Sequence, residues 1–197
     1  MLNTLNFIFD RVVVINLDRR PDRLREFDKQ AKANRIFYER FSAVDAVVEK
    51  ITPDDACVRS HREVLLKAIE DGVQRLFVFE DDAEFTKEFT TKFAEFYNKI
   101  KDDWDMLYLG AWIHNSKPYT DGVVKLKKSY SAHAYGINTH MMHKCLDATY
   151  NSWPIDISYS NLHKDINAYC AKPALVGQTP GFSDLLREYR DVRDKYL

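Results

Sequence analysis

Short apolar runs and amphipathic stretches alternate along much of the chain. Residues 12–17 form a β-branched run of the kind that is buried on both faces of a parallel sheet. The polar segment that follows carries Pro21, which suits the first turn of a helix reaching about Asn34. Because such alternation is typical of strand-helix-strand units, it predicts an α/β fold with a mainly parallel central sheet flanked by helices.

The same reasoning predicts the remaining elements. Thr52 and Pro53 are typical of a helix start, and Gly72 is a good helix terminator. Residues 154–156 open a loop or a short helix. We expect further strands at residues 36–44, 75–79, 105–110, 133–138 and 173–178, further helices at 86–100, 139–150 and 183–196, and a loop with a short hairpin strand, 123–126, between residues 111 and 130.

Composition narrows the class of protein. A chain of 197 residues fits one ordinary domain. Its 29 Lys and Arg nearly balance 30 Asp and Glu, so no global field favours nucleic acid or anionic lipid as a partner. Cys57, Cys145 and Cys170 lie far apart without CxxC spacing, which favours a reducing compartment. With no apolar run long enough for a membrane span and no signal-peptide pattern, we expect a cytoplasmic protein.

Three consecutive carboxylates, Glu80, Asp81 and Asp82, follow the apolar run 75–79 directly. Side chains alternate along a strand, so Glu80 and Asp82 are expected on one face and Asp81 on the other. Like charges at the end of a buried strand are costly unless a cation compensates them, and Mg²⁺ or Mn²⁺ prefers carboxylate oxygens. The triplet therefore indicates a metal-bound phosphate ester, with a solvated acidic turn as the alternative.

Two other segments carry candidate chemistry. Arg19, Arg20, Arg23 and Arg25 follow the first predicted strand, where a nucleotide diphosphate would lie in an open α/β sheet. The alternative is an exposed helix start in which Arg20 and Arg25 pair with neighbouring acids. Cys57 and His61 share the buried stripe of the helix that starts at Pro53. A lone histidine there is usually a hydrogen-bonded core residue, and the alternative is contact with a ligand at the sheet edge.

Taken in order, several segments resemble glycosyltransferase family 25, which includes enzymes of lipooligosaccharide assembly and is related to collagen galactosyltransferases. The resemblance covers residues 12–185. Each motif is weak alone, but the ordered set is specific. The matching stretches are VINLDRRPDR (14–23), RFSAVD (40–45), CVRSH (57–61), VFEDDA (78–83), WDMLYLG (104–110), HAYG (133–136) and PID (154–156).

The resemblance implies a single domain of GT-A type over residues 1–197, with a donor-binding half at about 10–110 and an acceptor side at about 111–185. It implies transfer of a hexose, with inversion, from UDP-galactose or UDP-glucose to a hydroxyl of a glycan or a glycosylated protein. Glu80, Asp81 and Asp82 then stand at the DxD-type motif, where Asp82 and Glu80 are the candidate ligands of Mn²⁺ or Mg²⁺. The other donor-site candidates that the resemblance implies are Asn16, Leu17, Arg19, Arg23, Asp45, Arg59, His61 and Asp81.

Two features of the implied site stay open. Many GT-A enzymes add a histidine ligand near the C-terminus, but none follows His163, which leaves Asp184, Gln178, the diphosphate or water for the remaining metal positions. Inverting transfer also needs a base, for which Asp156 is the first choice, with a helix cap as its alternative role, and Asp105 the second. Competing hypotheses are a nucleotidyltransferase or phosphoesterase, and a non-catalytic nucleotide- or glycan-binding domain.

Overall fold

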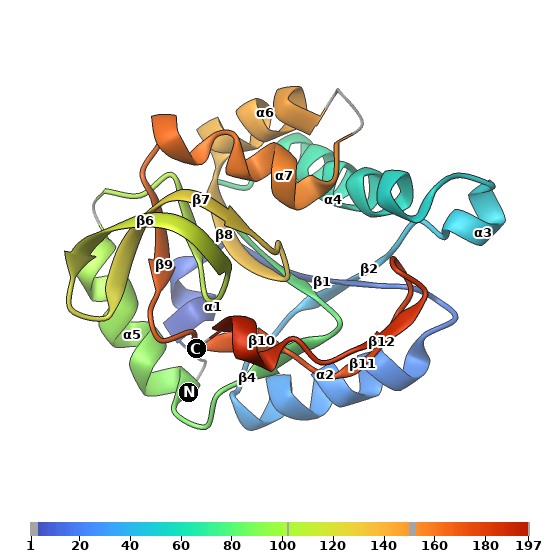
Figure 1. Ribbon diagram of the computed structural model, residues 1–197, viewed down its shortest axis with the longest axis horizontal. Coiled ribbons are helices and arrows are strands. Elements are labelled where there is room, and N and C mark those ends of the chain that lie inside the picture. Colours follow the sequence, from blue (N-terminus) through green and yellow to red (C-terminus); the bar gives the residue numbers. More distant parts are fainter. Residues whose placement is uncertain (1–3, 102, 150–152, 197) are drawn as a thin grey trace.

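Successive side chains of the central strands face two different helical layers. The computed structural model describes residues 4–101, 103–149 and 153–196. Val12 of the first strand packs in one core cluster with Phe27 and Phe93, whereas Val13 packs in a second cluster with Leu65. The sheet is therefore buried on both faces, as the β-branched run predicts. Figure 1 shows α4, α6 and α7 above the sheet and α2 and α5 below it.

The elements alternate in type over the first half of the chain. The helices are α1 (Thr4–Ile8), α2 (Pro21–Ala33), α3 (Ala46–Glu49), α4 (Pro53–Glu70), α5 (Phe89–Ile100), α6 (Thr139–Ala148) and α7 (Ile155–Ser160), with 3₁₀ turns η2 (His163–Asp165) and η3 (Arg193–Tyr196). The strands are β1 (Arg11–Asn16), β2 (Glu39–Ser42), β3 (Arg75–Glu80), β4 (Ala83–Phe85), β5 (Met106–Tyr108), β6 (Trp112–Thr120), β7 (Val123–Tyr130), β8 (Ala134–Asn138), β9 (Ala168–Ala171), β10 (Val176–Gln178), β11 (Gly181–Ser183) and β12 (Glu188–Arg190).

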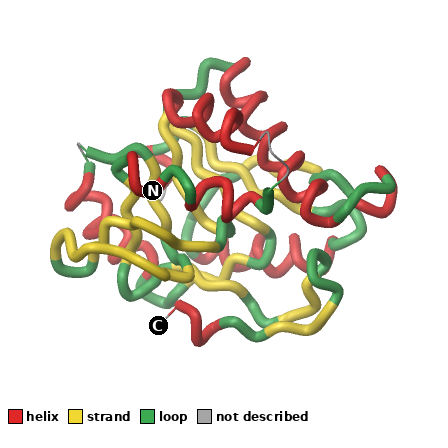
Figure 2. The backbone as a smooth tube through the Cα atoms, turned by 45° about the horizontal axis from the view of Figure 1, so that its top comes forward, coloured by secondary structure: helices red, strands yellow, loops and turns green. Residues whose placement is uncertain are grey.

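One eight-stranded sheet has the order β2-β1-β3-β8-β5-β9-β7-β6. The pairs β1-β2, β1-β3 and β5-β9 are parallel, while β8 and β7 are antiparallel to both of their neighbours. Within this sheet only β7 and β8 therefore run against the other strands, which confirms the mainly parallel sheet. Figure 2 shows the yellow strands between helices, with the C-terminal segment along the lower edge.

Helix α4 follows its sequence signals closely. The Thr52 hydroxyl accepts a hydrogen bond from the Asp55 backbone N–H at 3.1 Å, Pro53 occupies the first turn, and Gly72 adopts a φ of +72° just beyond the helix. A capping hydroxyl satisfies an orphan amide, and glycine adopts the left-handed conformation at little cost. This helix carries Cys57 and His61 on its sheet-facing side, so its start determines where both side chains lie.

The prediction for residues 111–130 is wrong in extent. The segment forms a long hairpin of β6 and β7 in place of a loop with one short strand, and Gly122 turns the chain between them with a φ of +73°. Strand β6 is the last in the sheet order, where Pro118 and an exposed, polar outer face are tolerated. An exposed edge strand lacks the apolar alternation on which the prediction depended.

The predicted C-terminal helix 183–196 is also wrong. Strands β11 and β12 form a hairpin there, followed by η3. Arg187 has a φ of +57°, which interrupts a helix, and the Ser183 hydroxyl accepts a hydrogen bond from the Leu186 N–H in a local turn. Strands β4 and β9 were not predicted, and strands β2 and β10 are shorter than expected. The predicted end of α6 at residue 150 lies outside the described residues.

Cys57, Cys145 and Cys170 are all free thiols. Within residues 4–101, 103–149 and 153–196, none of the helices combines the length and hydropathy needed to cross a bilayer.

Gly110 has the closest neighbouring backbone of the glycines in this chain. A β-carbon at this position would lie 2.0 Å from the Val176 carbonyl oxygen, a backbone atom of β10. We expect Gly110→Ala to lower the free energy of unfolding by about 1–3 kcal/mol, because the backbone must move to accept the methyl group. Gly181→Ala, where the β-carbon meets open space, is the matched control with a change within about 0.5 kcal/mol. Equal urea midpoints for the two variants would contradict this account of the contact.

Candidate functional site

A cleft of about 460 Å³ opens at the carboxyl ends of β1 and β3. The two strands are parallel neighbours, and Ile15 pairs with Glu80 in their register. The acidic triplet therefore lies beside the start of the arginine-rich segment that follows β1. Ligands bind at this edge in open α/β sheets, and the volume is within the range of small-molecule sites.

Asp81 is held from two sides. The Asn16 side-chain amide donates to its Oδ2 at 2.6 Å, and the Arg23 guanidinium donates to its Oδ1 at 3.0 Å. Burial raises the pKa of Asp81, although the charge of Arg23 and the hydrogen bond from Asn16 oppose that shift. Because both oxygens are already paired, Asp81 anchors Arg23 and the turn after β3.

Glu80 interacts with the imidazole of His61. Nε2 of His61 lies 3.3 Å from Oε1 of Glu80, and Nδ1 of the same ring lies 3.0 Å from the Tyr135 hydroxyl. Burial acts to raise the pKa of Glu80, but the hydrogen bond and charge of His61 outweigh it, so the pKa is lowered. Glu80 is therefore an ionised carboxylate beside a buried, oriented imidazole.

Asp82 is the least compensated of the three acids. Its Oδ2 accepts a hydrogen bond from the Gln178 amide at 3.3 Å and lies 3.9 Å from the Arg23 guanidinium. Its buried Oδ1 has no hydrogen-bond partner in the part of the chain that the structure describes. Burial, followed by the charge of Glu80, raises the pKa of Asp82 to about 7. This oxygen is free to coordinate a hard cation.

The alternation expected for the triplet holds only in part. Strand β3 ends at Glu80, and Asp81 and Asp82 lie in the turn before β4. The Thr179 backbone N–H donates to the Asp82 carbonyl at 2.8 Å, so contact with the segment after β10 fixes this turn. The position of Asp82 therefore depends on the C-terminal part of the chain, which the local sequence does not reveal.

Asp156 faces the same cleft from the first turn of α7. Its Oδ1 accepts a hydrogen bond from the Ile157 N–H at 2.8 Å, and its Oδ2 accepts one from the Ser131 N–H at 3.4 Å. Burial raises its pKa, while these backbone donors oppose the shift. Asp156 thus combines a local capping contact with a half-buried carboxylate that can accept a proton.

The arginines after β1 have acidic partners. Arg19 pairs with Asp45 at 2.8 Å and with Asp184, and Arg20 pairs with Asp22 and Asp184. Burial acts to raise the pKa of Asp184, but the two arginines lower it. These contacts tie the C-terminal segment to the start of α2 across the mouth of the cleft.

The structure brings together most of the predicted site residues. Those that line the cleft are Leu17, Arg19, Arg23, His61, Glu80, Asp81, Asp82 and Asp156. Asn16 lies behind them as a support for Asp81, and Asp45 caps α3 while binding Arg19. Sequence reasoning gave Cys57 no role in the site and left Gln178 as one of several options, although both line the cleft.

Two predicted residues lie elsewhere. Asp105 precedes β5, at the end of the strands where β3 begins, so the length of β3 separates it from Glu80. Its carboxylate contacts Nε2 of His140 at 2.6 Å and accepts a hydrogen bond from the Asn167 N–H at 2.8 Å. This position removes Asp105 as a base for chemistry in the cleft.

Arg59 points away from the cleft as well. Its side chain is about half exposed. The guanidinium pairs with Glu49 of α3 at 3.3 Å and with Glu63, which lies on α4 like Arg59 itself, at 4.0 Å. Helical spacing puts Cys57 and His61 on the sheet-facing side of α4, and Arg59 lies between them in sequence on a different face. The structure therefore places Arg59 in a surface ion-pair network.

Comparison with known proteins finds a matching family and several similar proteins. The family described as "Glycosyltransferase family 25 (LPS biosynthesis protein)" matches residues 52–133. Procollagen galactosyltransferase 1 of Danio rerio is 26% identical over 220 residues, covering 87% of this chain and 36% of the relative. The procollagen lysyl hydroxylase and glycosyltransferase of Acanthamoeba polyphaga mimivirus is 26% identical over 227 residues, covering 87% and 25%. The chain thus spans about a quarter to a third of the length of these relatives.

Solved structures share the fold at low identity. A crystallised protein from STIV has a TM-score of 0.54 at 11% identity, with 91% of this chain and 92% of that chain covered. A glycosyltransferase involved in glycosylation of the major capsid of PBCV-1 has a TM-score of 0.54 at 8% identity, with 90% and 95% covered. The α/β fold of GT-A type is confirmed, and the family match and the curated relatives confirm the resemblance of this chain to glycosyltransferase family 25.

Proposed function

We propose that this chain is a metal-dependent glycosyltransferase that transfers a hexose from UDP-galactose or UDP-glucose, with inversion, to a hydroxyl of a glycan or a glycosylated protein. The observation that carries the proposal is that one cleft combines Oδ1 of Asp82, which no described residue pairs, with the half-buried carboxylate of Asp156 and with Arg19 and Arg23. The names of the curated relatives support a galactosyl donor and a protein-linked acceptor.

Asp82 and Glu80 are the proposed ligands of Mn²⁺ or Mg²⁺. The unpaired oxygen of Asp82 and the ionised carboxylate of Glu80 are the hard donors that these ions prefer. When bound, such an ion supplies Lewis-acid stabilisation of the departing diphosphate. Of the options for a further ligand, Gln178 lies beside Asp82, because its amide N–H donates to that carboxylate, while its Oε1, the atom that would bind an ion, accepts from the Tyr196 hydroxyl; Asp184 is engaged by Arg19 and Arg20.

Arg19 and Arg23 are the proposed diphosphate-binding residues. Both line the cleft, and both now pair with carboxylates. A guanidinium fork binds phosphate oxygens as readily as carboxylate oxygens, so a diphosphate can replace part of these acidic partners. Arg23 also donates to the Phe182 carbonyl at 2.6 Å, which links phosphate binding to the position of β11.

Asp156 is the proposed base. The acceptor hydroxyl gives its proton to an Asp156 oxygen while its own oxygen bonds to the anomeric carbon and the bond from that carbon to the diphosphate breaks. The raised pKa of Asp156 brings its basicity closer to that needed near neutral pH, and the Ser131 and Ile157 amides orient the carboxylate. The bond to the leaving group lies opposite the attacking oxygen, so the configuration inverts.

The proposed transfer and its three competitors differ in their products. Transfer or hydrolysis of a UDP-sugar releases UDP. A nucleotidyltransferase given UTP and a hexose 1-phosphate releases pyrophosphate, a phosphoesterase given a phosphate monoester releases inorganic phosphate, and a binding domain releases nothing. Separate incubations with UDP-sugars and an acceptor panel, with UTP and hexose 1-phosphates, and with a phosphate monoester, each with Mn²⁺ and with or without EDTA, separate these cases. Release of pyrophosphate or phosphate without UDP would overturn the proposed transfer.

Replacement of Asp82 tests the metal assignment. We expect Asp82→Asn to lower metal-dependent UDP release by at least about 100-fold, because the free carboxylate oxygen that binds the ion is lost. Asp105→Asn, at the opposite end of the strands, is the control and should retain turnover. Unchanged UDP release by Asp82→Asn at saturating Mn²⁺ would show that the ion binds elsewhere.

Replacement of Asp156 tests the base. Asp156→Asn keeps the size of the side chain but cannot accept the hydroxyl proton, so kcat should fall by about 10²–10⁴-fold while the affinity for UDP is retained. The pH profile of kcat/KM in the wild-type protein should lose activity as Asp156 becomes protonated at low pH. A variant with normal kcat and the same acidic limb would exclude Asp156 from proton transfer.

The raised pKa of Asp82 predicts a pH dependence of stability. Its pKa is about 7 in the folded protein and about 3.9 in an unfolded chain. Between these values the unfolded chain releases the proton while the folded protein keeps it, so stability falls as pH rises from about 4 to 7. Asp82→Asn cannot ionise, so its free energy of unfolding should not fall over this pH range. At pH 8 we expect the variant to be more stable than the wild type by about 2–4 kcal/mol, and at pH 4 we expect a much smaller difference. Urea unfolding at the two pH values in EDTA measures it, and a pH-independent difference would contradict it.

A further inference from the structure

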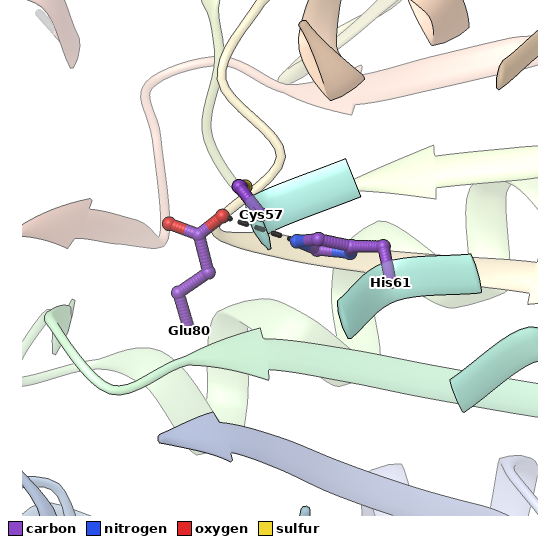
Figure 3. A group of neighbouring side chains, drawn as sticks. All are labelled: Cys57, His61 and Glu80. Carbon is purple, nitrogen blue, oxygen red and sulfur yellow. Dashed lines mark hydrogen bonds and ion pairs between the residues drawn. The ribbon is translucent and has the colours of Figure 1, made fainter. Parts of the chain in front are cut away.

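Three different ligand types meet on the α4 side of the cleft. Sγ of Cys57, a ring nitrogen of His61 and a carboxylate oxygen of Glu80 all lie within 4.8 Å of one another. Figure 3 shows Cys57 and one Glu80 oxygen near the same ring nitrogen of His61, with the other Glu80 oxygen pointing away. Two neighbouring elements create the group, because Cys57 and His61 are four residues apart on α4 and Glu80 ends β3.

The distances suit a tetrahedral ion. Nε2 of His61 and Oε1 of Glu80 are 3.3 Å apart. Bonds of about 2.0–2.1 Å from zinc to nitrogen and oxygen place two tetrahedral ligands roughly 3.3–3.4 Å apart. The third ligand, Cys57, lies one helical turn from His61 on the same side of α4, so its sulfur requires only a small side-chain adjustment.

His61 is already oriented as a ligand. Its Nδ1 lies 3.0 Å from the Tyr135 hydroxyl, which in turn lies 3.4 Å from the Tyr159 hydroxyl. Ion binding requires the ring proton to move from Nε2, where Glu80 accepts it, to Nδ1, where the Tyr135 hydroxyl can accept it; the lone pair of Nε2 then faces Glu80 and Cys57. Such outer partners fix the tautomer and ring orientation of a metal-bound histidine.

The donor set selects the ion. A thiolate and an imidazole favour borderline-soft zinc over Mg²⁺ or Mn²⁺, which prefer oxygen ligands. Asp54, Asp82 and Asp156 line the same cleft, so the surrounding charge favours a cation. Because Cys57, His61 and Glu80 all line the cleft, a fourth coordination position faces the open space.

We propose that Cys57, His61 and Glu80 form a zinc site with an open fourth position, next to the hard-cation site at Asp82. Zinc binding removes the proton of the Cys57 thiol to solvent, while His61 binds as neutral imidazole and Glu80 as carboxylate. The site itself does not rest on the proposed transfer reaction. Its consequence does: Glu80 belongs to both ligand sets, so zinc competes with Mn²⁺ and inhibits transfer.

Metal binding without any sugar donor tests the site. We expect the full chain to take up one equivalent of Zn²⁺ in competition with a chromophoric chelator, and Co²⁺ in its place to give the near-ultraviolet charge-transfer band of a cobalt thiolate. Cys57→Ser should abolish the band and weaken zinc binding by at least about 100-fold. Cys145→Ala, which removes a buried thiol outside the group, is the matched control and should retain both.

Two further measurements distinguish loss of the zinc site from loss of the fold. Thermal unfolding of each variant shows that it is folded, and alkylation of Cys57, followed by mass spectrometry, should slow when zinc is present. No stoichiometric uptake, a cobalt spectrum without a thiolate band, or zinc binding as tight in Cys57→Ser as in the wild type would each overturn the site. Failure of UDP release alone would not, because these assays contain no donor.

Discussion

The concentration of negative charge at the end of β3 is the constraint on which the rest of the site depends. Glu80, Asp81 and Asp82 are consecutive, and each is at least partly buried. Desolvation and mutual repulsion disfavour three ionised groups so placed. The protein compensates them unequally: Asp81 has two donors, Glu80 has an imidazole, and Asp82 retains an unpaired oxygen among the described residues. That oxygen is the observation on which the proposed metal site at Asp82 rests.

The side chains that contact the acidic triplet come from separate parts of the chain. The parallel register of β1 and β3 brings Arg23 and Asn16 to one side, and α4, packed on the opposite face of the sheet from α2, brings His61 to the other. The C-terminal segment closes the third side through Gln178 and Asp184. Core packing therefore fixes α4 and the strands, whereas ion pairs and turn contacts hold the arginines and the C-terminal segment. Polar contacts at a solvent-accessible edge are the part of this arrangement that a phosphate ligand can most readily rearrange.

The sequence predicts those parts of the molecule whose structure is decided locally or by repeated pattern. Helix α4, strand β3 and the acidic triplet follow from capping residues, periodicity and charge. Asp105 and Arg59 lie outside the cleft because membership of a matching motif does not tell which end of a strand or which face of a helix a residue occupies. The hairpin β6-β7 was underestimated because an edge strand need not show apolar alternation, and Gln178 could not be chosen as a neighbour of Asp82 because antiparallel pairing of β10 with β4 creates that contact.

Glu80 has a different role from its two neighbours, and the reason is geometric. It is the last residue of β3, so strand alternation turns it toward α4, whereas Asp81 and Asp82 belong to the turn. On that side it meets the imidazole nitrogen of His61 and the sulfur of Cys57, while the turn presents the carboxylate oxygens of Asp81 and Asp82 beside Arg23. The two proposed metal sites therefore differ in softness and adjoin at a single carboxylate. In this proposal an ion bound on the α4 side uses the ionised ligand that an ion at Asp82 would need, so the side of Glu80 on which a cation binds follows from its preference for sulfur and nitrogen or for oxygen.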